Sequence, residues 1–216
     1  GNKSLWEERF PVSDLLKRKM EIGTYAFETE FQNNPISSDI CLWRPDWIKR
    51  WDKIPEIKLR FAALDPAASE KESADYSAMV CWGVGVDDHI YELDSWKGRW
   101  GTWELVEKVM SFYLLHKPLR FGVEEVAFQS ILKNLLIREA QKRGIYIPIE
   151  GISLGRYTGK EVNVKQPRDK FTRALSVIHF FEQDLVRLKT QSLIEQLVTF
   201  PTGSEDDLVD AAVYGL

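Results

Sequence analysis

Two apolar segments joined by a very short turn constrain the fold of this chain more than any other feature. The first, Tyr76–Val86, predicts a buried strand, and His89–Trp96 predicts the next one. Only Asp87-Asp88 separates them, and so tight a turn requires the two strands to run antiparallel. A third run, Leu59–Asp65, ends in Asp-Pro, which predicts a strand followed by a turn. The main domain therefore begins with a set of neighbouring strands.

Helical and strand patterns alternate after this set. The predicted elements, in chain order, are a helix over Gly101–His116, a strand over Leu119–Glu125, a helix over Phe128–Gly144 and a strand over Ile145–Ile152. A helix over Asp169–Glu182, a short strand over Leu185–Lys189 and two helices after Ser192 and Ser204 follow. Antiparallel strands followed by βαβ crossovers predict a mixed sheet with helices on its faces. This β-β-β-α-β-α-β order is that of the ribonuclease H-like α/β fold.

The first 58 residues differ in character from the rest. They combine helical and irregular patterns, and Ser13 is a candidate helix cap. Their aromatic residues are Trp6, Phe10, Tyr25, Phe27, Phe31, Trp43, Trp47 and Trp51. We expect residues 1–58 to form a linker or extension that packs these aromatics onto a main domain spanning 59–216. Both ends of the chain suggest a domain cut from a longer protein.

The composition is that of an ordinary globular domain. The chain has 216 residues, of which 44% are hydrophobic, and its formal net charge is −4. No run approaches the roughly 20 apolar residues that span a bilayer, and no signal peptide opens the chain. The sequence thus predicts neither a membrane protein nor a secreted one. Cys41 and Cys81 lie among apolar residues without metal-ligand spacing, so we expect buried thiols.

Acidic residues follow two predicted strands and open the last helix. Asp65 ends the first strand and Glu124 ends the fourth, and the predicted order makes these strands neighbours. Asp206, Asp207 and Asp210 lie near one face of the last helix. Carboxylates gathered in one place repel each other unless cations neutralise them, and oxygen ligands suit Mg²⁺ or Mn²⁺. Two such ions roughly 3.5–4 Å apart would suit phosphodiester hydrolysis.

Each acidic motif also has a purely structural explanation. Asp65 precedes a proline and could only start a turn. Glu124 and Glu125 point to opposite faces of a strand, so one of them could be a surface charge. The segment Ser204–Asp207 fits a helix cap whose acids complement the helix dipole. The metal hypothesis therefore depends on the three elements together and on their order.

Five short segments, in this order, resemble the nuclease region of large terminase subunits of tailed bacteriophages. They are Phe27–Pro35, Leu64–Ala67 with Asp75–Ala78, Val123-Glu124 with Ala127–Gln129, Lys170–Ala174, and Asp206–Ala211. The resemblance implies a metal-dependent nuclease that cuts concatemeric double-stranded viral DNA, with two Mg²⁺ or Mn²⁺ ions held by Asp65, Glu124 and Asp207. Asp206 or Asp210 could assist. Family members often carry aspartate where this chain has Glu124.

The same resemblance implies partners and a location. The partners would be double-stranded DNA, the ATPase half of the same polypeptide, the portal and the small terminase subunit, in the cytoplasm of a bacterial host. The ATPase half is not present, since Gly155–Glu161 fails the spacing of a phosphate-binding loop.

Basic residues between the fifth strand and the acidic helix predict where DNA lies. They are Arg156, Lys160, Lys165, Arg168, Lys170 and Arg173. Cationic linings of this kind bind phosphates without reading sequence, so cutting should be nearly indifferent to sequence. A solvated loop is the alternative interpretation of this segment.

Three other functions remain open at this point. One is another nuclease on this fold, such as a Holliday-junction resolvase or a transposase. The second is a non-enzymatic interaction module whose acids are caps and surface charges. An actin-like nucleotide-binding domain is the third, but it would need a second half of similar fold, for which the chain is too short.

Overall fold

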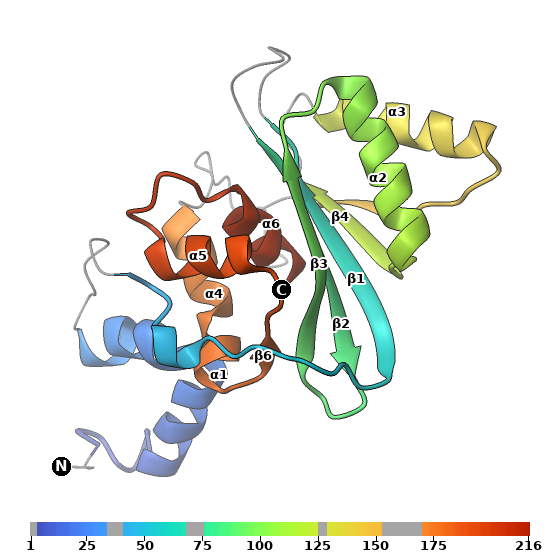
Figure 1. Ribbon diagram of the computed structural model, residues 1–216. Helices are drawn as coiled ribbons and strands as arrows, with labels where there is room; N and C mark the ends of the chain where they lie inside the picture. Colours follow the sequence, from blue (N-terminus) through green and yellow to red (C-terminus); the bar gives the residue numbers. More distant parts are fainter. Residues whose placement is uncertain (1–3, 34–40, 68–75, 125–128, 153–169) are drawn as a thin grey trace.

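A mixed six-stranded sheet forms the centre of the molecule (Figure 1). The computed structural model describes residues 4–33, 41–67, 76–124, 129–152 and 170–216, and the sheet order is β5-β4-β1-β2-β3-β6. The strands are β1 (Ile57–Asp65), β2 (Ser77–Gly85), β3 (Ile90–Gly98), β4 (Arg120–Glu124), β5 (Ile149–Ile152) and β6 (Val186–Arg187).

The strand directions follow the predicted order. β2 runs antiparallel to both β1 and β3, whereas β4 is parallel to β1, β5 to β4 and β6 to β3. The prediction of a mixed sheet built from a hairpin set and crossovers is confirmed. The fifth strand is shorter than predicted, because the backbone of Ile145 still bonds to Ala140 at the end of the preceding helix and Pro148 follows.

Helices cover both faces of the sheet, as Figure 1 shows. The helices are α1 (Val12–Gln32), α2 (Thr102–His116), α3 (Gln129–Lys142), α4 (Lys170–Glu182), α5 (Gln191–Thr199) and α6 (Asp207–Gly215), with a 3-10 turn η1 (Pro45–Trp47). The pair α2 and α3 packs on one face, and α4, α5 and α6 pack on the other. α1 lies against α4 on the outside of this second layer. None of the helices in the described part of the chain is both long and apolar enough to cross a membrane.

Each layer has its own hydrophobic core. Val80 and Trp82 face the α4–α6 layer, whereas Met79 and Cys81 face α2 and α3. This alternation is the period of two that a strand imposes on its side chains. β2 is buried almost throughout, which explains its nearly continuous apolar sequence.

The N-terminal region departs from the prediction in two ways. α1 begins at Val12 with Pro11 at the capping position, so the expected cap at Ser13 is wrong. Proline suits a helix start because its fixed φ is helix-compatible and the missing N–H would have no partner there. Gly23, at φ +81°, interrupts the helix, and a Cβ there would lie 2.9 Å from His179 of α4. Glycine thus permits both the bend and the close contact with α4.

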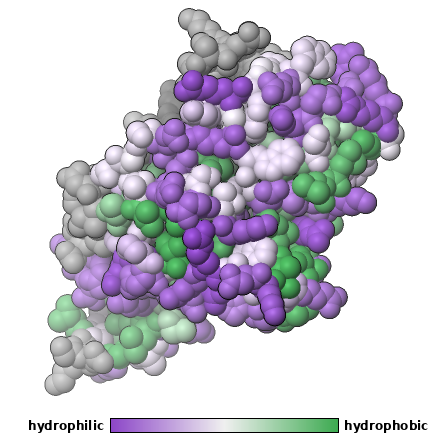
Figure 2. Space-filling model, in the orientation of Figure 1, coloured by the Kyte–Doolittle hydropathy of each residue, from purple (hydrophilic) through white to green (hydrophobic). Residues whose placement is uncertain are grey.

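The aromatics of the first 58 residues are only partly buried, which corrects the expectation. Trp43 is fully buried and Phe27 nearly so, but Trp6, Phe10 and Phe31 are 54%, 44% and 41% exposed. Figure 2 shows apolar surface over this N-terminal end of the molecule, at the lower left. The expectation for the cysteines is also half wrong, since Cys81 is buried but Cys41 is exposed.

Candidate active site

The sheet topology brings Asp65 and Glu124 to the same edge. β1 and β4 are parallel neighbours, and their register pairs Leu64 with Val123. Asp65 and Glu124 are the last residues of these strands, so they follow that pair side by side. Two carboxylates that are distant in sequence therefore meet at the carboxyl ends of adjacent strands, where ligands bind in open α/β sheets.

Both side chains point toward the α4–α6 layer. Leu64 and Val123 are buried against α2 and α3, and the next residue of each strand faces the opposite side. This alternation places Asp65 and Glu124 on the face that α6 covers, and both are partly buried there. Glu125, the alternative to Glu124 as a ligand, lies outside the described residues.

The N-terminal end of α6 adds further carboxylates to this edge. α6 packs against β1, β2 and β4, and Asp210 in its first turn has a side chain only 6% exposed. Asp206 occupies the capping position but makes no capping hydrogen bond. The backbone N–H of Leu208 instead donates to Oε1 of Gln196 at 2.9 Å. The interpretation of Ser204–Asp207 as a helix cap is therefore wrong for the side-chain cap bond, although Asp207 does lie in the first turn of α6.

The electrostatics of Asp65 show how closely these groups approach. The pKa of Asp65 is raised to about 8, chiefly by burial and then by the nearby carboxylates of Asp210, Glu124 and Asp207, against a lowering by Lys170. Among these acids the influence of Asp210 is largest and that of Asp207 smallest. The ionised cluster is thus unfavourable unless cations neutralise it.

Cations of the chain itself bind the carboxylates. Nζ of Lys170 lies 2.7 Å from Oδ2 of Asp210 and 2.9 Å from both oxygens of Asp206. Arg173 donates from Nη2 to Oδ1 of Asp210 at 2.9 Å, and this pair is buried. On the other side of the cluster, Nζ of Lys97 lies 3.1 Å from Oδ2 of Asp207.

These pairs bear on the predicted DNA contacts. Lys170 and Arg173 face the acids of α6 rather than standing apart from them, so their role toward DNA stays a prediction. The other four predicted contacts lie outside the described residues: Arg156, Lys160, Lys165 and Arg168.

Tyr214 is a site residue that the sequence analysis missed. Its hydroxyl donates a hydrogen bond to Glu124, and burial, followed by this bond, raises the pKa of Tyr214. Its ring centroid lies 5.2 Å from the guanidinium carbon of Arg173. A signal was present, because Tyr214 follows Asp210 by four residues and so shares its helix face.

The carboxylates are ligands that a divalent cation prefers, and Lys97, Lys170 and Arg173 pair with those of α6. Among the described residues, no group of three or more His, Cys, Asp or Glu side chains is arranged to hold a metal ion. The donor set is nevertheless made of hard oxygen ligands, which Mg²⁺ and Mn²⁺ prefer. The raised pKa of Asp65 marks a place where added positive charge would be stabilising.

The strand order and the crossovers define a ribonuclease H-like fold. No family model matches the sequence, and no curated protein matches it. The large terminase of bacteriophage HK97 is similar in structure, with a TM-score of 0.52 at 12% identity over 99% of this chain and 50% of that one.

Two separate nuclease domains are also similar. A mutant nuclease domain of the large terminase subunit gp2 of bacterial virus Sf6, with manganese and beta-thujaplicinol, gives a TM-score of 0.51 at 11% identity over 74% of this chain and 88% of that one. The Mn-soaked, inhibitor-bound human cytomegalovirus terminase nuclease domain gives 0.48 at 19% identity over 72% and 80%. At identities this low, the TM-scores above 0.5 establish a shared fold and nothing more. The activity therefore has to be argued from the site.

Proposed function

We propose that this chain is a divalent-metal-dependent endonuclease that cuts double-stranded DNA at the edge formed by β1, β4 and α6. The observation that carries the proposal is the convergence of Asp65, Glu124 and the α6 aspartates on one partly buried edge. In a module that only binds another protein, a carboxyl group such as that of Asp65, whose pKa burial and neighbouring acids raise to about 8, would have no functional role. A cation-binding hydrolytic site gives it one.

The proposed ligands are Asp65, Glu124 and Asp207, with Asp210 or Asp206 assisting. Two Mg²⁺ or Mn²⁺ ions there would supply Lewis-acid activation of water and of the scissile phosphate. Asp65 is close enough to Glu124 and to the α6 acids to feel the charge of each, so it would hold a cation together with either. Tyr214 orients Glu124 through its hydroxyl group. The influence of Asp210 on Asp65 exceeds that of Asp207, which favours a direct role for Asp210 as well.

The substrate we propose is concatemeric viral DNA, cut with little sequence specificity during genome packaging in a bacterial host. The fold shared with terminases of HK97 and Sf6 supports this proposal. It extends to the partners: an ATPase half in the same polypeptide, the portal and the small terminase subunit. Within the chain, we propose that 1–58 are a linker or extension and that 59–216 are the nuclease domain.

Plasmid cleavage tests the proposal. Asp65→Asn should abolish Mn²⁺-dependent cutting because it removes the charge that both ions share. Asp88→Asn is the matched control, since Asp88 lies in the β2–β3 turn with its side chain 84% exposed. Full cutting by Asp65→Asn would refute the assignment. Cutting of branched DNA in strong preference to plain duplex would instead favour a resolvase.

A further inference from the structure

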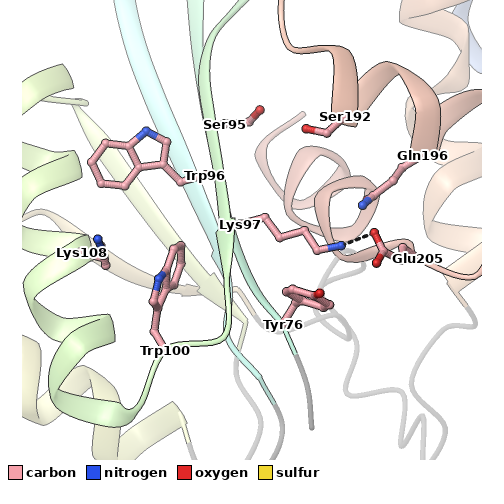
Figure 3. Close-up of a pocket in the computed structure, with 9 residues that line it drawn as sticks. All are labelled: Tyr76, Ser95, Trp96, Lys97, Trp100, Lys108, Ser192, Gln196 and Glu205. Atoms are coloured by element: carbon pink, nitrogen blue, oxygen red, sulfur yellow. Dashed lines mark hydrogen bonds and ion pairs between the residues drawn. The ribbon is translucent and has the colours of Figure 1, made fainter. Parts of the chain in front are cut away.

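A second feature lies beside the carboxylate edge, in a cavity of about 600 Å³ along β3, with α2 on one side of the strand and α5 on the other (Figure 3). Nζ of Lys97 connects the two places, because it lies 2.7 Å from Oε2 of Glu205 in the cavity wall and 3.1 Å from Oδ2 of Asp207. A molecule that fills the cavity is therefore one lysine side chain away from the proposed cutting site.

Aromatic side chains form much of the cavity wall. Tyr76, Trp96 and Trp100 line it, and Figure 3 shows Trp96 and Trp100 on the same side of β3 as Lys108, and Tyr76 on the side of Glu205. A Cβ on Gly98 would lie 2.4 Å from the ring of Trp100, so glycine is required for this ring to lie against the strand. The indole is thus held in place by the backbone of β3.

The cavity is also positively charged on balance. Lys97 and Lys108 line it, and Glu205 is the acid among its lining residues. Lys97 already neutralises Glu205, which leaves the charge of Lys108 for a ligand. Nζ of Lys108 lies 6.0 Å from the ring centroid of Trp100, so a cation stands over an aromatic face. Aromatic faces combined with lysines are the means by which proteins bind unpaired nucleotides.

We propose that this cavity binds an unpaired nucleotide of the DNA strand next to the cutting site, with its base on Trp100 and its phosphate at Lys108. The volume lies in the range of about 300–1,000 Å³ typical of small-ligand sites, which admits one nucleotide but not a double helix. The hydroxyl group of Ser192 adds a polar contact in the wall. The inference rests on the proposed function, because it names the part of the DNA that the same site holds.

The test is binding of a short, fluorescently labelled oligothymidine in EDTA, measured by anisotropy, so that no cutting occurs. Trp100→Ala should weaken binding by about 5- to 100-fold, the effect of losing one stacked base. Trp103→Ala is the matched control, because Trp103 is 63% exposed on α2 and does not line the cavity. Lys108→Gln should weaken binding and lower its dependence on salt without removing an aromatic ring.

Three outcomes overturn the proposal: no binding by the unmodified chain, unchanged binding by Trp100→Ala and Lys108→Gln, or an equal loss in Trp103→Ala. Plasmid cleavage, measured separately, keeps the two proposals distinct. If the unmodified chain cuts plasmid but the cavity variants bind oligothymidine normally, only the cavity proposal fails. If the cavity variants lose binding selectively but Asp65→Asn cuts normally, the cavity site stands and the proposed cutting site fails.

Discussion

Replacing Asp65 by Asn should stabilise the metal-free protein, and increasingly so as the pH rises. In the folded chain the pKa of Asp65 is raised from 3.8 to about 8 by burial and by the neighbouring carboxylates. Asparagine has a similar shape but no ionisable group. The substitution therefore removes the unfavourable charge that the fold otherwise excludes by keeping Asp65 protonated.

The magnitude follows from the two pKa values. Below about pH 4, Asp65 is protonated in both the folded and the unfolded chain, so the variant and the parent should be equally stable. Above that pH, the unfolded chain releases a proton that the folded chain retains, at about 1.4 kcal/mol per pH unit. At pH 7 the ceiling is roughly 4 kcal/mol, and we expect on the order of 1–4 kcal/mol after relaxation of the site. At roughly 2–4 °C per kcal/mol, the melting temperature should rise by several degrees.

Urea denaturation in EDTA at several pH values between about 5 and about 8 measures this difference. Asp88→Asn, in the exposed turn, should show no such pH-dependent gain. In millimolar Mn²⁺ the order should reverse, because the parent gains stability by binding the ion and Asp65→Asn does not. A variant that is less stable than the parent near pH 7, or a gain that does not grow with pH, would refute the reasoning.

Three further substitutions test the surroundings of Asp65. Lys170→Gln should bind Mn²⁺ more tightly in calorimetry, because Lys170 no longer occupies Asp210; weaker binding would contradict this. Arg173→Met should lower the free energy of unfolding by roughly 1–3 kcal/mol, since buried Asp210 loses a charged hydrogen-bond donor and keeps Lys170. A loss below about 1 kcal/mol in urea denaturation would show that the Arg173–Asp210 pair is dispensable. Tyr214→Phe should lower the free energy of unfolding by about 1–2 kcal/mol in the same assay, because it removes the hydrogen bond to Glu124. Unchanged stability would mean that this bond does not stabilise the site.

The central sheet could be predicted because its signals are local. The apolar strand β2 and the two-residue Asp87-Asp88 turn fix a hairpin without reference to the rest of the chain. The crossovers then place β4 beside β1. Because Asp65 and Glu124 end these two parallel strands, they lie next to each other. The site was predictable to the extent that topology alone determines which strand ends are adjacent.

The partners of the acids could not be predicted, because they depend on side chains that meet only in the folded chain. Lys170 and Arg173 belong to the basic segment that the sequence predicts to contact DNA, and nothing local indicates that both contact Asp210. The exposure of Cys41 and Trp6 is unpredictable for the same reason, since apolar neighbours in sequence do not determine which residues a surface segment buries. Lys97 of β3 is the clearest case, as it pairs with Glu205, 108 residues further along the chain, and with Asp207 at the start of α6.

The arrangement of charge at the edge argues for function over structural support. A fold optimised for stability would replace Asp65 with a neutral residue, because its carboxyl group is unfavourable there when ionised. The chain instead retains Asp65 and pairs the neighbouring acids with Lys97, Lys170 and Arg173. These cations lower the repulsion between the carboxylates and leave the carboxylate oxygens in place. The ammonium group of Lys170, whose side chain is 47% exposed, can move away when a divalent cation binds. The guanidinium group of Arg173, whose side chain is buried, cannot. Such a site keeps its ligands in place before the ion binds, which is what a metal-dependent hydrolase requires and a capping motif does not.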